Sequence, residues 1–156
     1  MNTDYETIEY IKKVITDILS SGGFNVRVEY EQSLVSGLIF HINSRDSKLL
    51  IGRQGMTLQA LELLVFAIVN RHQKDSEQPV RFSLDVDEYR SHRQWQLKQT
   101  VKDAVSKLKY SKEPIVLPAM PRHERKFVHN YIQEQFPHIT TSSTGEEPNR
   151  SIQMNI

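Results

Sequence analysis

The chain has 156 residues, a formal net charge of +1, 38% hydrophobic residues and 25% charged residues. This composition is typical of a soluble globular protein that forms one domain or two small ones. The chain contains no cysteine, which excludes disulfides and thiolate metal sites and fits a reducing compartment. No apolar run is long enough to span a membrane, and the polar, acidic N-terminus does not resemble a signal peptide, so we expect a cytoplasmic protein without membrane insertion.

The charges are unevenly distributed along the chain. Residues 1–86 hold 9 basic and 11 acidic side chains, whereas residues 87–126 hold 10 basic and 5 acidic ones. A basic stretch favours a polyanionic partner, but it does not establish one by itself.

The first half of the chain predicts helices and strands in the order α-β-β-α-α-β, an α+β fold with helices packed on a three-stranded sheet. Its elements are a helix capped by Thr3 or Asp4 and ending at residues 20–23, strands over residues 24–30 and 36–42, one helical turn over residues 46–51, an apolar helix from residue 56 to about residue 70, and a strand over residues 79–86.

The second half of the chain predicts a different set of elements. A long amphipathic helix leaves the first unit and supports the second, and residues before prolines are expected to be extended. We therefore assign two domains, residues 1–86 and residues 87–156. The expected elements of the second are a helix over residues 89–110, an extended segment over residues 112–118, a helix from Pro121 to Pro137, and a hairpin of residues 139–143 and 151–156.

Two glycines enclose a short basic loop, Gly52-Arg53-Gln54-Gly55, in front of the apolar helix. Glycine permits a sharp turn and a close approach of another backbone. The first N–H groups of the helix and the Arg53 side chain supply positive charge. This combination suits a phosphate group, although a glycine-rich turn that only starts a core helix is the structural alternative.

The helix after Pro121 carries four potentially cationic side chains on one face. Projected at 100° per residue, they span an arc of about 100° opposite the apolar residues. Contact with nucleic-acid phosphates is the functional interpretation, and a solvated helix face is the structural one. A metal site is disfavoured, since His123 and His129 lie on different sides of the helix and cannot bind the same ion. The four residues are Arg122, Arg125, Lys126 and His129.

The long connecting helix leaves two interpretations open. Lys98, Lys102 and Lys109 fall within about 40° of one another, and they either cover the edge of a core or contact nucleic acid. Trp95 either packs at the junction between the domains or stacks on a base.

The element order with Ile51-Gly52-Arg53-Gln54-Gly55 resembles a type II KH domain. The second half resembles the R-3-H domain, named for an arginine and a histidine separated by three residues, here Arg125 and His129. Over about residues 4–156 the tandem resembles the bacterial Jag family (SpoIIIJ-associated proteins, also called KhpB or EloR). The motifs that carry the resemblance follow one another as Leu50 to Gly55, Thr57 to Leu61, Leu84 to Arg90 with Arg93, Leu117 to Met120, Glu124-Arg125 with His129, and Thr141 to Arg150.

The resemblance implies cytoplasmic binding of single-stranded RNA, a link to cell elongation or sporulation, and in some bacteria a small KH-only partner protein. It also implies that Gly52 to Gly55 form the phosphate loop and that Arg125 with His129 form a second site. Many family members begin with an additional N-terminal domain and a charged linker, which are not expected here. Many KH loops carry two basic residues between the glycines, so Arg53 with Gln54 implies a weaker contact.

The first hypothesis is a non-enzymatic, cofactor-free protein that binds single-stranded RNA or single-stranded DNA. The loop would hold the phosphate backbone, while Ile51, Leu58 and Ile39 would line a groove for bases. The four cationic groups on the helix after Pro121 would add a second phosphate contact.

The rival hypothesis is a protein-interaction adaptor that pairs with a KH-only partner or with a second copy of the chain. The helix from residue 56 is apolar nearly all round, and burial inside the fold is the default explanation of that pattern. No enzyme is expected, because the chain has no cysteine nucleophile, no Walker-type Lys-Ser/Thr and no H-E-x-x-H. We interpret Asp85, Asp87 and Glu88 as solvated carboxylates, because alternation places Asp85 and Asp87 on the outer face of a strand end.

Overall fold

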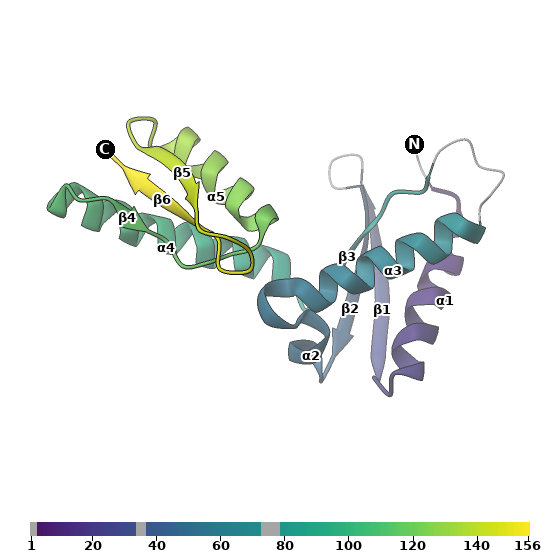
Figure 1. Ribbon diagram of the computed structural model, residues 1–156. Helices are drawn as coiled ribbons and strands as arrows, with labels where there is room; N and C mark the ends of the chain where they lie inside the picture. The colour runs from purple at the N-terminus through teal and green to yellow at the C-terminus, as the bar shows by residue number, and fades with distance from the viewer. Residues whose placement is uncertain (1–2, 34–36, 73–78) are drawn as a thin grey trace. The chain divides into compact units, whose positions relative to one another are not determined.

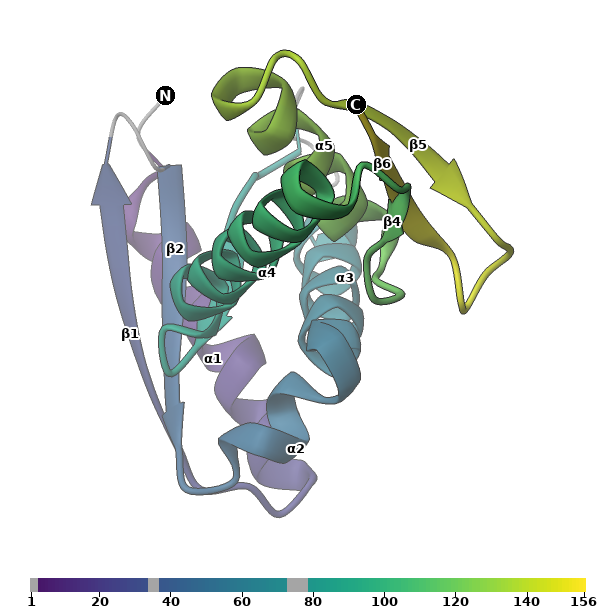
Figure 2. The same cartoon turned by 90° about the vertical axis from the view of Figure 1, so that its left-hand side faces the viewer.

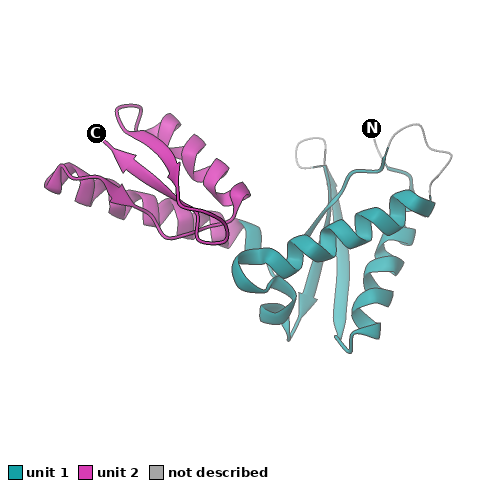
Figure 3. Ribbon diagram, viewed as in Figure 1, with its two compact units in different colours: residues 1–90 teal, residues 91–156 magenta. Residues whose placement is uncertain are grey.

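A computed structural model describes residues 3–33, 37–72 and 79–156 of the chain. It is a mixed helix and strand structure (Figure 1), as the sequence predicts. The chain forms two compact units, residues 1–90 and residues 91–156 (Figure 3). The assignment of two domains with a boundary after residue 86 stays a prediction.

The first unit contains the predicted order of helices and strands, with a single 3-10 turn between the second and third helices. Its elements are α1 (Tyr5–Ser21), β1 (Val26–Ser33), β2 (Gly37–Ser44), α2 (Ser47–Ile51), η1 (Arg53–Gly55), α3 (Met56–His72) and β3 (Ser83–Val86).

In the first unit β2 is the central strand of a three-stranded sheet. β1 pairs with it antiparallel and β3 pairs with it parallel. α1 and α3 cover the same face of this sheet (Figure 2). Ile11, Phe40 and Val65, from α1, β2 and α3, are fully buried in the core between them.

β3 is shorter than the strand predicted over residues 79–86. The side chain of Asn70 takes the place of a ladder partner, because its Oδ1 accepts from the Val80 N–H at 2.8 Å and its Nδ2 donates to the Val80 carbonyl at 3.3 Å. The backbone at Val80 is therefore satisfied by a side chain, and pairing with β2 begins only at Ser83.

The expectation that Asp85 is a solvated carboxylate is wrong. Its side chain is only 7% exposed, and Oδ1 accepts from the backbone N–H groups of Val86 at 3.0 Å and Arg90 at 3.2 Å. The second of these N–H groups belongs to the first turn of the following helix and has no partner within it. Asp85 therefore links the end of β3 to the start of that helix, while Asp87 is exposed as expected.

The second unit places two helices against one face of a three-stranded antiparallel sheet in the order β4-β6-β5. The predicted hairpin is confirmed, and the extended segment after residue 112 adds a short third strand that pairs with β6. Val101, Leu108, Val128 and Met154 are fully buried in its core. The elements are α4 (Tyr89–Ser111, whose first two residues belong to the first unit), β4 (Ile115–Val116), α5 (Arg122–Gln135), β5 (Thr140–Thr144) and β6 (Ser151–Asn155).

Candidate functional site

The loop Gly52–Gly55 lies between the end of α2 and the start of α3. Gly52 ends α2, and its N–H donates to the Lys48 carbonyl at 3.0 Å. Its backbone has φ 70° and ψ −171°, a region that is essentially restricted to glycine. A Cβ on Gly52 would lie 2.0 Å from Thr57 Oγ1 and 2.7 Å from Thr57 Cβ. Only glycine therefore fits the first position of the loop.

Two further residues of the loop also have positive φ. Gln54 has φ 53°, and Gly55 has φ 78°. A Cβ on Gly55 would lie 2.8 Å from Cε1 of the Tyr89 ring. Both glycines are thus required by backbone conformation and by close packing, which supports the predicted sharp turn.

Arg53 is the exposed cation of this loop. Its side chain has no ion-pair partner within residues 3–33, 37–72 and 79–156, and the exposed Lys48 lies one helical turn before Gly52. The N-terminus of α3 follows directly, with its partial positive charge. The loop is therefore a basic, closely packed turn, as the sequence predicts.

The three apolar residues expected to line a groove for bases differ in burial. Ile51 and Ile39 are half-buried, but Leu58 is 2% exposed and belongs to the core of the first unit. The expectation that Leu58 lines a groove is wrong. Leu58 occupies the buried face of α3 together with Leu61, Val65 and Val69, since these positions recur at helical spacing.

The predicted cationic face of α5 divides into an exposed part and a buried part. Arg122 and Lys126 are exposed. His129 is half-buried, and its Nδ1 shares a hydrogen bond with the Thr141 hydroxyl on β5. These three groups lie at the surface or close to it, as the helical projection predicts.

Arg125 differs from the prediction. Its side chain is 7% exposed, one guanidinium nitrogen donates to the Met120 carbonyl at 2.7 Å, and another donates to Glu147 at 2.6 Å. A helical projection gives the direction in which a side chain points but not which other segments cover it. Here Arg125 is covered by the segment between β5 and β6, which contains Glu147. Arg125 therefore connects α5 to two loops.

An ion pair between α4 and α5 was not predicted. The guanidinium of Arg93 donates to both carboxylate oxygens of Glu124, at 2.7 and 2.9 Å, and Glu124 is 3% exposed. Both residues occur in the motifs of the Jag resemblance, but no periodicity in the sequence pairs them.

α3 is not buried all round, so the expectation that the fold encloses it is wrong. Outside its buried face, four large apolar side chains are exposed, and Leu63 reaches 69% exposure. We call this set the apolar face of α3; its members are Met56, Leu63, Leu64 and Ile68. Part of this face borders a groove of about 470 Å³ lined by Met56, Gln59, Ala60, Glu62, Leu63, Phe66 and Phe82.

The described residues contain no group of three or more histidine, aspartate or glutamate side chains placed to hold a metal ion. Nor does any helix within the described ranges combine the length and apolar character needed to cross a lipid bilayer. The features that stand out chemically are therefore the basic loop, the cations of α5 and the apolar face of α3.

Comparisons with known proteins match both units. The model of the R-3-H domain matches residues 96–155. The RNA-binding protein KhpB of Clostridium symbiosum is 31% identical over 147 residues, which is 94% of this chain and 63% of that protein. The RNA-binding protein KhpB of Bacillus subtilis is 34% identical over 114 residues, covering 72% of this chain and 53% of that protein.

A third protein with the same name, from Lactiplantibacillus plantarum, is 34% identical over 104 residues, or 67% of this chain and 31% of that protein. The chain thus spans between about a third and about two thirds of the length of these relatives. Their shared name and the match to the R-3-H domain agree with one another. The chain belongs to the KhpB (Jag) family, with an R-3-H domain over residues 96–155.

Proposed function

We propose that this chain is a non-enzymatic cytoplasmic protein that binds single-stranded RNA, and that its first unit is a type II KH domain. The observation that carries the proposal is the loop Gly52–Gly55, which combines two obligatory glycines with an exposed Arg53 at the start of α3. A phosphate of the RNA backbone would approach the loop closely because neither glycine has a Cβ. The names of the KhpB relatives support RNA as the ligand.

A second contact would come from Arg122, Lys126 and His129 of the R-3-H domain. Arg122 and Lys126 are exposed, and a guanidinium group binds phosphate oxygens through two parallel hydrogen bonds. Arg125 contributes indirectly in this proposal, because it holds the segment that contains Glu147 beside α5. Two weak sites on one chain raise the overall affinity through effective concentration.

Fluorescence anisotropy with labelled single-stranded RNA at several salt concentrations tests the proposal. The variant Arg53→Asp/Gln54→Asp removes the loop cation and reverses the local charge. Asp is compatible with the left-handed backbone at Gln54 (φ 53°), so the variant is expected to fold. We expect weaker binding and a salt slope that falls by about 0.7 for each lost phosphate contact.

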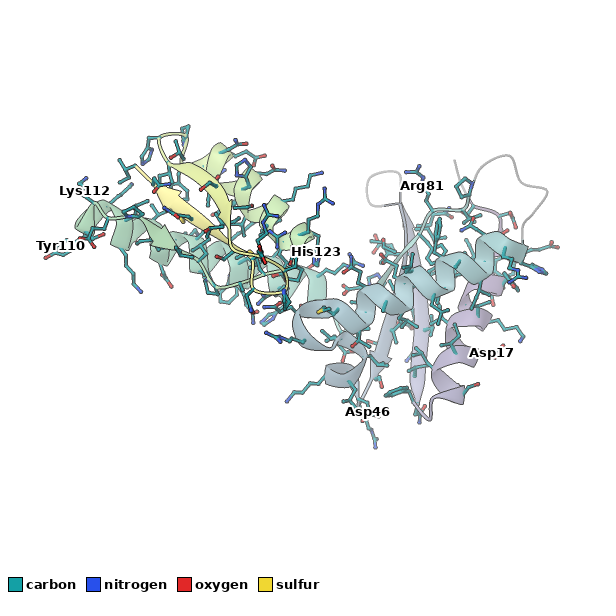
Figure 4. All side chains as sticks on the ribbon, in the orientation of Figure 1. Asp17, Asp46, Arg81, Tyr110, Lys112 and His123 are labelled. Atoms are coloured by element: carbon teal, nitrogen blue, oxygen red, sulfur yellow. The ribbon has the colours of Figure 1, made fainter. Side chains whose placement is uncertain are left out.

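The single variant Arg53→Asp has a matched control in Arg81→Asp, since each replaces an exposed arginine of the first unit with aspartate and changes the net charge by the same amount. Arg81 lies just before β3, at the opposite end of the sheet from Asp46 and α2 (Figure 4). Equal loss of affinity in the two variants would mean that only net charge matters and would overturn the loop as the binding site. Labelled single-stranded DNA of the same sequence tests whether DNA is bound as well.

The biological setting that we propose is post-transcriptional regulation linked to cell elongation or sporulation. It rests on membership of the KhpB family, of whose members the chain spans only part. Cross-linking of bound transcripts in the host, with the Arg53→Asp/Gln54→Asp variant as control, tests it.

The apolar face of α3 favours a second function, pairing with a second copy of the chain or with a small KH-only partner. Exposed apolar patches on a monomer often mark interaction sites, and α3 leaves Met56, Leu63 and Leu64 exposed. Sedimentation of the free protein over a range of concentrations tests self-pairing. We expect Leu63→Glu to shift a dimer to monomer, while Asn43→Glu, at an exposed polar position of β2 outside α3, leaves it unchanged.

A further inference from the structure

A strip of side chains runs along α4 on the side opposite its buried face. The helix buries Leu97, Val101 and Leu108, and projection at 100° per residue places the strip on the far side, within about 60° of Trp95. None of its members is acidic. We call it the α4 strip; its residues are His92, Trp95, Gln99, Lys102, Ser106 and Lys109.

Trp95 is the most unusual member of the strip. Tryptophan side chains are on average highly buried, yet Trp95 is 58% exposed. The imidazole of His92 is stacked with it, at 6.1 Å between ring centroids and an interplanar angle of 25°. The two rings therefore form an aromatic pair at the surface of the second unit.

The lysines of α4 fall into two groups. Lys98 is partly buried, and its Nζ lies 6.0 Å from the Phe127 ring centroid and 5.6 Å from that of Tyr131, so it covers the edge of the core as one interpretation of the sequence predicts. Lys102 and Lys109 are exposed and have no ion-pair partner in the described part of the chain. Their charge is therefore available to an anion.

The chemistry of the strip matches a single-stranded nucleic acid. Proteins bind such strands by stacking bases on aromatic side chains while cations follow the phosphate backbone. Trp95 supplies the stacking surface, and Lys102 and Lys109 extend the positive charge along the helix for about 21 Å from Trp95. Asp103 is the one carboxylate on α4, and it lies about 80° away from Trp95.

We propose that the α4 strip is a third contact surface for single-stranded RNA, on which one base stacks against Trp95 and the backbone passes Lys102 and Lys109. This inference rests on the proposed function for its ligand, but it assigns that ligand to residues outside the loop Gly52–Gly55 and outside the cationic face of α5.

The chain offers its own reporter, since Trp95 is the single tryptophan. Titration of the full chain with unlabelled single-stranded RNA should quench its fluorescence, with the same midpoint as anisotropy measured on labelled RNA. Trp95→Ala should weaken binding by about 5-fold to 150-fold, the range measured for loss of one stacked base, whereas Trp95→Phe should retain part of the affinity.

The lysines have a matched control on the same helix. Lys102→Gln should weaken binding and reduce its salt dependence, whereas Lys107→Gln should not, because the equally exposed Lys107 lies about 120° from Trp95. Circular dichroism of each variant verifies the fold.

The outcomes separate this inference from the proposed function. Binding in anisotropy with unchanged Trp95 fluorescence, and with wild-type affinity in Trp95→Ala, would overturn the α4 strip and leave RNA binding intact. If the chain did not bind RNA even at low salt, both the α4 strip and the proposed function would be contradicted. If acrylamide and iodide fail to quench Trp95 in the free protein, a protein surface covers the ring, and the strip is an interface instead.

Discussion

Arg93 donates two hydrogen bonds to the carboxylate of Glu124, at 2.7 and 2.9 Å, and so connects the second turn of α4 to the first turn of α5. Glu124 is 3% exposed, and a buried carboxylate without its partner is strongly destabilising. Arg93→Met should therefore lower the free energy of unfolding of the second unit by about 3 kcal/mol, the lower end of the usual range, because Arg93 itself is partly exposed. Hydrogen exchange of the backbone amides in the full chain measures the loss of stability separately in each unit.

Two further variants make this prediction specific. Lys107→Met removes an exposed charge from the same helix and should change the unfolding free energy little. Replacing both partners, Arg93→Met/Glu124→Leu, should recover much of the loss because no charge is then left buried. Equal protection of α4 and α5 in Arg93→Met and Lys107→Met would contradict the importance of the pair.

Gly52→Ala and Gly23→Ala test whether the loop needs glycine for more than its backbone angle. Both residues have positive φ, 70° and 82°, but a Cβ on Gly23 meets nothing within 4 Å. Gly23→Ala should reduce the unfolding free energy by about 1 kcal/mol, and Gly52→Ala by about 3 kcal/mol. The larger loss follows from the Cβ and backbone nitrogen of Thr57, at 2.7 and 3.1 Å, since neither moves when the Thr57 side chain rotates. Equal losses in thermal unfolding would contradict the close packing of the loop.

The cap of α1 predicts a pH dependence of stability. The backbone N–H of Thr7 donates to Asp4 Oδ1 at 2.8 Å and the Thr7 hydroxyl donates to Oδ2 at 2.9 Å, and these bonds lower the pKa of Asp4 below its ordinary value of 3.8. A lowered pKa in the folded state gives stability that is present above pH 3.8 and is lost as the pH falls through the folded value.

Urea unfolding at several pH values measures this effect. The difference in stability between the wild type and Asp4→Ala should be largest near neutral pH and should shrink in acid. Asp4→Asn should keep a helix cap with a weaker pH dependence, since Asn caps helices about as well but does not ionise. A constant difference between wild type and Asp4→Ala at all pH values would contradict the role of the carboxylate.

The order of helices and strands could be predicted because apolar periodicity and glycine positions are local properties of a sequence. These local patterns predict a cap at Thr3 or Asp4, of which the structure uses Asp4, together with the hairpin of β5 and β6 and the turn Gly52–Gly55. The N-terminal limit of β3 could not be predicted in this way. It depends on Asn70, ten residues before Val80 in the sequence, whose side chain bonds the Val80 backbone.

Depth of burial could not be predicted from helical projection. The projection places Arg125 among exposed cations, and the apolar composition of α3 favours a helix enclosed by the fold; the structure reverses both. Arg125 is covered because Glu147 comes from a segment between two strands, and Leu63 is exposed because a three-stranded sheet with α1 occupies only one side of α3. Both outcomes depend on contacts between distant parts of the chain.

The distinction between buried and exposed cations on α5 predicts that stability and RNA affinity can be separated. Arg125→Met leaves Glu147 and the Met120 carbonyl without their donor. It should therefore lower the melting temperature of the second unit, and it should weaken RNA binding only through that loss of stability.

Arg122→Gln/Lys126→Gln changes two exposed side chains, so it should leave the melting temperature nearly unchanged. The same double variant should weaken binding by about 1 kcal/mol or more and reduce its salt slope. Calorimetry and anisotropy on the two variants measure both quantities. If Arg125→Met kept its melting temperature while losing affinity, Arg125 would contact the RNA directly, and the buried geometry would not describe the protein in solution.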